Sequence, residues 1–186
     1  WKGIDTIEAG ATGSLTTESR FGVDNMLVYA FSQPHTPTPP PATPTPAGAI
    51  FTVSEGFETW SEGDAAANTT INGWLLSPGM STGDPAANAQ FEIVDTGRTK
   101  YMAIGRKAGA TVASQATVVN NFTKMTSSFV AEFGIIAPAL GSYFIQLQDS
   151  SKTAVPILIK VTSTTISITN NKATVGTITV VDKPVS

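Results

Sequence analysis

A stretch rich in proline and threonine divides this chain into two unequal parts. Residues 37–47 read PTPPPATPTPA and follow His35 and Thr36. Proline lacks the backbone N–H donor and fixes φ, so the stretch cannot form a helix or an interior strand, and we predict a solvated polyproline II linker over residues 34–48. Linkers of this composition join the modules of secreted proteins, so we expect a secreted, extracellular or cell-surface protein.

The two parts differ in what they can build. Residues 1–33 are too few to form a hydrophobic core alone, yet they end in a strongly strand-like segment, FGVDNMLVYAF at residues 21–31. Residues 49–186 are enough to bury a core. The sequence therefore predicts an N-terminal strand segment at 1–33, a linker, and a folded domain over 49–186.

The composition excludes several kinds of partner. Only 13% of the residues are charged, against about 25% in average soluble domains, and the formal net charge is −3 with 11 Lys and Arg that do not cluster. This pattern argues against binding to nucleic acid or to anionic lipid. The sequence holds no cysteine, which excludes disulfides and thiolate sites, and no apolar run approaches the roughly 18 residues of a membrane span.

Alternation of apolar and polar residues recurs along most of the chain and is typical of strands. Polar, turn-forming residues separate the strands at 149–152 and 170–172. The predicted strands lie at residues 90–94, 101–104, 116–120, 129–136, 142–149, 154–161, 164–169 and 173–181. Many short strands without an amphipathic helix indicate an all-β fold, an antiparallel two-sheet jelly-roll sandwich.

Two groups of motifs carry a resemblance to a known family. Residues 54–60 read SEGFETW and residues 71–74 read INGW, while residues 4–7 read IDTI and residues 21–29 read FGVDNMLVY. The first pair resembles the opening of bacterial jelly-roll carbohydrate-binding modules and concanavalin-A-like (laminin-G-like) domains. The second pair resembles the last strand of the same domains. The resemblance covers both ends and most of the strand rhythm, and it implies a carbohydrate-binding function.

The order of these motifs is reversed relative to the family, because the last-strand motif precedes the first-strand motif. Residues 1–31 could be the tail of a preceding module, complete the sheet of a neighbouring copy, or return to their own sandwich as in a circular permutant. Twelve residues of polyproline II span roughly 37 Å at about 3.1 Å each, which suits either of the last two routes. We favour a neighbouring copy, since the linker is stiff. We therefore predict self-association through residues 21–31, beside the strand that contains Phe57 and Glu58.

The resemblance also implies a metal site. In these modules a Glu of the first-strand motif and an Asp of the last-strand motif often bind a structural Ca²⁺, an ion that prefers carboxylate and carbonyl oxygens. The matching residues here are Glu58 and Asp24, with Glu55 as a reserve. The alternative is that both are ordinary surface or turn carboxylates.

Aromatic residues are the candidates for sugar binding, because the apolar faces of sugar rings stack on aromatic planes. The side chains to test are those of Trp60, Trp74, Tyr101 and Tyr143. The competing interpretation places them in the core, and for Trp74, in an apolar run with Leu75 and Leu76, the core is the stronger expectation.

Catalysis has little support in the sequence. Concanavalin-A-like glucanases carry acids at alternating positions of one strand, as in ExDxE, and no such triplet occurs here. Glu132 is alone in its strand, and the single histidine, His35, lies at the start of the linker. We therefore expect no enzyme.

Our main hypothesis is a non-catalytic carbohydrate-binding module of a secreted bacterial multimodular protein that binds a polysaccharide or cell-surface glycan. The alternative is a structural subunit of an extracellular filament or surface array built by strand complementation.

Overall fold

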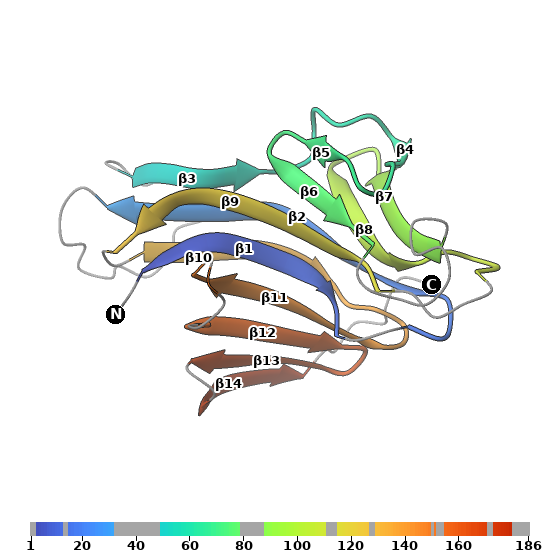
Figure 1. The fold of residues 1–186 in the computed structure, drawn as a ribbon. Helices are drawn as coiled ribbons and strands as arrows, with labels where there is room; N and C mark the ends of the chain where they lie inside the picture. Colours follow the sequence, from blue (N-terminus) through green and yellow to red (C-terminus); the bar gives the residue numbers. More distant parts are fainter. Residues whose placement is uncertain are drawn as a thin grey trace.

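The computed structural model describes residues 3–12, 15–31, 49–78, 88–110, 115–126, 129–149, 151, 155–170 and 173–179. Its regular structure is all β, in two antiparallel sheets packed face to face (Figure 1). The predicted all-β, two-sheet antiparallel sandwich is therefore confirmed. The described residues contain no helix long and apolar enough to cross a membrane.

The first sheet has eight strands. In spatial order they are β14 (Ala173–Thr179), β13 (Thr165–Asn170), β12 (Ile157–Thr162), β11 (Ser142–Gln148), β1 (Ile4–Ala11), β9 (Thr117–Met125), β6 (Trp74–Ser77) and β5 (Thr70–Ile71). In both sheets together, seven of the eight predicted strands begin and end within a few residues of an observed strand. The eighth, 116–120, matches only the first part of the longer strand β9.

The second sheet has six strands. In spatial order they are β10 (Phe129–Ile136), β2 (Ser19–Phe31), β8 (Lys100–Arg106), β7 (Ala89–Asp95) and β4 (Gly63–Asp64), with β3 (Ala49–Glu55) also paired to β2. β2 pairs with β10 along most of its length, with β8 through residues 19–23 and with β3 through residues 26–31. Strand β2 is therefore flanked on both sides.

The N-terminal segment occupies the middle of both sheets rather than an edge. β1 lies between β11 and β9, as Figure 1 shows, and β2 lies between β10 and the β8–β3 side. Residues before and after the linker thus share both sheets, and neither sheet is continuous without the N-terminal strands.

The structure differs from our prediction that residues 21–31 pair with a neighbouring copy. All strands paired with β2 belong to its own chain, and β3 begins where β2 ends, with Phe31 opposite Ala49. The proline-rich stretch itself lies outside the described residues, but the segments on either side of it form an antiparallel pair. A connection between adjacent strand ends needs little reach, so the third arrangement, return to the same sandwich, is the one present.

The core lies between the sheets and follows the period-two pattern. Alternate residues of each central strand point inward, and the inner positions are fully buried. They include Ile7 and Ala9 of β1, Val23 and Val28 of β2, Phe91 and Ile93 of β7, Met102 and Ile104 of β8, and Ile145 and Leu147 of β11. In β2 the alternation changes face at the register shift beside Asn25, so Val23 before it and Val28 after it are both inner positions.

Candidate functional site

The two carboxylates expected to bind calcium meet at one threonine. The Thr99 hydroxyl is 2.7 Å from Oε1 of Glu58 and 3.2 Å from Oδ2 of Asp24, although these acids are far apart in the sequence. The backbone N–H of Lys100 also donates to Glu58, at 2.9 Å. The structure thus places Asp24 and Glu58 together at the start of β8. A single hydroxyl hydrogen can serve only one of the two acids at a time.

Local turns bring these acids into place. Asp24 accepts hydrogen bonds from the backbone and the side chain of Asn25, which has a positive φ of 46°. On the other side Phe57 has a φ of 59°, and its N–H donates to Glu55 at 2.7 Å. Both residues are therefore in the left-handed region, which is uncommon for side chains other than glycine. We expected Phe57 and Glu58 within a strand. β3 ends at Glu55, so both residues lie in the turn that follows the strand.

The environment of Glu58 favours its charged form. The hydrogen bonds from the Lys100 backbone and from the Thr99 hydroxyl lower the pKa of the Glu58 carboxyl below its usual value. The side chain of Glu58 is solvent-exposed, whereas Asp24 is buried. Among the described residues, no group of three or more His, Cys, Asp or Glu could hold a metal ion. Two carboxylates and a hydroxyl are nevertheless oxygen donors of the kind that Ca²⁺ accepts.

The four aromatic residues expected to stack on sugar are all buried. The exposed fractions are 4% for Trp60, 1% for Trp74, 7% for Tyr101 and 0% for Tyr143. Phe57 packs edge-on against Trp60 at 5.5 Å, and Phe21 stacks on Tyr143 at 4.6 Å. Burial raises the pKa of Tyr143 to about 12 and also raises that of Tyr101. A stacking platform needs an exposed ring face, so these rings stabilise the fold and do not form such a platform.

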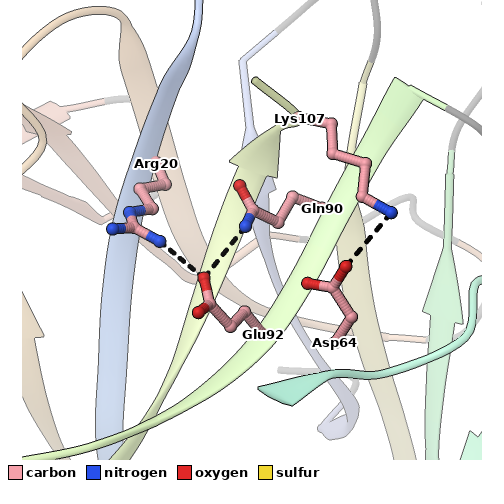
Figure 2. Close-up of polar contacts among 5 residues, drawn as sticks. All are labelled: Arg20, Asp64, Gln90, Glu92 and Lys107. Carbon is pink, nitrogen blue, oxygen red and sulfur yellow. Dashed lines mark hydrogen bonds and ion pairs between the residues drawn. The ribbon is translucent and has the colours of Figure 1, made fainter. Parts of the chain in front are cut away.

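The outer face of the six-stranded sheet carries a polar cluster that we did not predict from the sequence. Nη1 of Arg20 on β2 lies 2.5 Å from Oε2 of Glu92 on β7, and Nε2 of Gln90 donates to the same oxygen at 2.9 Å. Beside this group, Nζ of Lys107 lies 3.1 Å from Oδ2 of Asp64 on β4. Figure 2 shows the two groups next to each other across neighbouring strands. We call these five residues the polar row.

Residues without bulky side chains make room for the polar row. Gly105 of β8 is paired with Arg20 on one side and with Gln90 on the other, and Glu92 is paired with Ala103. A Cβ at Gly105 would meet the Ser19 carbonyl oxygen at 2.0 Å. With little above β8 to obstruct it, the Arg20 side chain crosses that strand and reaches Glu92 on β7.

A hollow lies at the β4 end of the polar row. It has a volume of about 380 Å³ and is lined by Asp64, Ala65, Ala66, Ala67, Ala89, Gln90, Phe91 and Lys107. Asp64, Gln90 and Lys107 of the polar row are among the lining residues, and the four alanines contribute only short side chains. A signal for this face exists in the sequence, because Arg20 precedes buried Phe21, and Gln90 and Glu92 flank buried Phe91. Alternation alone therefore places these three polar side chains on the outer face.

Comparison with models of protein families, with curated protein sequences and with solved structures found no match.

Proposed function

We propose that this chain is a non-catalytic carbohydrate-binding β-sandwich module of a secreted protein, and that its ligand surface is the polar row with the adjoining hollow. The observation that carries the proposal is that the amide of Gln90, the carboxylate of Asp64 and the ammonium group of Lys107 line a concave space together with four alanines. The Arg20–Glu92 ion pair adjoins this space through the hydrogen bond from Gln90 to Glu92. A volume of about 380 Å³ is within the range of small-ligand sites.

The chemistry of the row suits hydroxyl groups. Arg20 and Lys107 donate to Glu92 and Asp64, which accept, and Gln90 also donates to Glu92 (Figure 2). The amide of Gln90 has an oxygen as well, so it can both donate and accept. A sugar hydroxyl is also both donor and acceptor, so neighbouring hydroxyls of one ring can meet this mixture of groups. Binding through hydrogen bonds replaces the aromatic stacking that the buried rings do not provide.

The charges of the row favour an uncharged glycan. Two cations and two anions form two ion pairs, at 2.5 Å and 3.1 Å, so the row carries no net charge. An acidic polysaccharide would face Glu92 and Asp64 without a surplus of cations, and like charges would oppose it. We therefore propose a neutral polysaccharide as the ligand. Because both carboxylates of the row are held in ion pairs, we propose binding without catalysis.

Affinity electrophoresis in gels that contain single neutral or acidic polysaccharides tests the proposal. At least one neutral polysaccharide should slow the migration of the wild type. Gln90→Ala and Lys107→Ala should each abolish this retardation. Lys124→Ala, an exposed lysine on β9 of the other sheet, should leave it unchanged. Absence of retardation in every gel, or equal loss with Lys124→Ala, would exclude the polar row as the ligand surface.

We also propose a structural Ca²⁺ held by Asp24 and Glu58. The support is that two carboxylates from distant parts of the chain both contact the hydroxyl of Thr99. This hydroxyl has one hydrogen and can donate to only one of them at a time. A cation bound only by the folded state raises the melting temperature by mass action. Excess EDTA should therefore lower the melting temperature of the wild type and leave that of Asp24→Asn unchanged, and equal melting temperatures of the wild type with and without EDTA would exclude the ion.

A further inference from the structure

The eight-stranded sheet ends at β14, whose only neighbour among the described residues is β13. The backbone donors and acceptors that point away from β13 therefore have no described strand to pair with. Such an edge is a template for another strand. β14 also lies well away from the N-terminal strands, as Figure 1 shows, so this edge is separate from residues 21–31.

The sheet near β14 is only partly covered by its partner sheet. Val161 of β12 is fully buried, whereas Ile166 and Ile168 on the neighbouring β13 are half-buried. The loss of burial across one strand spacing indicates that the eight-stranded sheet extends past the six-stranded one at this end. These half-buried isoleucines beside an open edge keep apolar area that a strand paired there could cover.

Other sheet ends carry features that discourage pairing. β4 and β5 are two residues long, β10 carries Glu132 and a register shift, and β3 ends in Glu55. β14 reads ATVGTIT and its neighbour β13 reads TISITN, and neither contains a charge or a proline. A register irregularity beside Thr169 leaves residues 176–179 as the regular part of the edge. This regular part is longer than β4 or β5 and carries neither the charge nor the proline that usually prevents strand addition.

We propose that β14 is a self-association surface, which pairs antiparallel with β14 of a second copy across a two-fold axis. A second copy fits because the strand is uncharged, so two identical edges approach without like-charge repulsion. In an antiparallel two-fold pair the donors of each strand meet the acceptors of the other. Thr177 and Thr179 in the regular part of the edge are exposed, and threonines paired across strands are favourable.

Sedimentation velocity of the whole chain over a concentration series tests the proposal. The wild type should form a concentration-dependent dimer below about 500 µM, a range typical of a modest interface. Thr177→Lys places two ammonium groups near the axis and should weaken the dimer at least about tenfold. Thr123→Lys, an exposed threonine on the interior strand β9, is the matched control and should dimerise like the wild type.

A mixing experiment separates lost pairing from lost folding. Thr177→Lys and Thr177→Glu should each be monomeric, and an equimolar mixture should form a heterodimer because the charges across the axis are then opposite. A wild type that stays monomeric throughout the series, a dimer unaffected by Thr177→Lys, or a dimer lost equally with Thr123→Lys would overturn the proposal.

Discussion

At the residue scale, Gly105 allows β2 to approach β8 closely beside the polar row. Gly105 and Gly176 are both in strands, but a Cβ at Gly105 would meet backbone atoms of Ser19 and Arg20 within 2.7 Å, whereas nothing lies within 4 Å of a Cβ at Gly176. The backbone of β2 cannot move aside easily, because β2 is also paired with β10 on its other side.

The two glycines give a matched pair of substitutions. Gly105→Ala should lower the free energy of unfolding by about 1–3 kcal/mol, the usual cost of overpacking, and Gly176→Ala should change it by less than about 0.5 kcal/mol. Urea denaturation followed by tryptophan fluorescence measures both values. Equal effects of the two substitutions would contradict the close approach of β2 to β8.

Glu58 gives a prediction about pH. The hydrogen bonds from the Lys100 backbone and the Thr99 hydroxyl hold the pKa of the Glu58 carboxyl below its usual value. They therefore stabilise the folded chain above the unfolded-state pKa, and this stabilisation is lost as the pH falls through the folded-state pKa. The melting temperature of the wild type should therefore fall as the pH drops below about 4.5, and Glu58→Gln should reduce that fall. Glu62→Gln, an exposed control in the same turn region, should leave the pH profile as it is in the wild type.

At the element scale, β2 connects the two parts of the chain. Val28 is fully buried and is paired with Val53 of β3 on one side and with Ala131 of β10 on the other. Whichever neighbour its N–H faces, that N–H has a place in a hydrogen-bond ladder. This is why proline is expected only at edges and bulges and not at such a position.

Val28→Pro should therefore unfold or strongly destabilise the single chain, by at least about 2 kcal/mol, since it removes a ladder donor and leaves an acceptor unpaired in the interior. Val28→Ala removes two methyl groups but keeps the donor, and it should cost less. Thermal melts followed by circular dichroism compare the two. A folded Val28→Pro chain with altered oligomeric state only would show that β2 pairs between copies.

Much of the strand content could be predicted from the sequence, and the neighbours of each strand could not. Alternation marked segments such as 129–136 and 142–149 because inner and outer residues differ in burial. The order of strands depends on pairings between residues far apart, such as Ala9 with Ile145 and Val118, and local pattern carries no record of them. For this reason the sequence favoured pairing of the N-terminal strands with a neighbouring copy, whereas β1 and β2 lie between strands of their own chain.

The candidate sites show the same limit. Asp24 and Glu58 were brought together by a resemblance of short motifs, and the structure joins them through Thr99, which the sequence did not indicate. The aromatic side chains were selected by chemistry alone, but all four are buried, because large rings are also what a sandwich core needs. Alternation around Phe91 could have identified Gln90 and Glu92 as outward-facing residues.

At the scale of the whole molecule, the two sheets depend on residues from both sides of the linker. Removing residues 1–31 would leave β11 and β9 of the eight-stranded sheet without the strand between them, and β10 without its partner β2. The truncated chain should therefore lack a cooperative thermal transition, and a separate peptide of residues 1–31 should restore it. A cooperative transition in the truncated chain alone would contradict the central position of β1 and β2.

Cutting the chain within the linker tests the same arrangement without removing any strand. Because β1 and β2 are hydrogen-bonded on both sides within their own chain, a protease site inserted between residues 36 and 46 should give two fragments that remain together. The nicked protein should elute at the mass of the intact chain on size exclusion with light scattering at low concentration, and the fragments should separate only in denaturant. Release of the N-terminal fragment under native conditions would place these strands outside their own sandwich. A nicked species at twice the mass at every concentration would indicate that they are exchanged between two copies, since the linker is long enough for either connection.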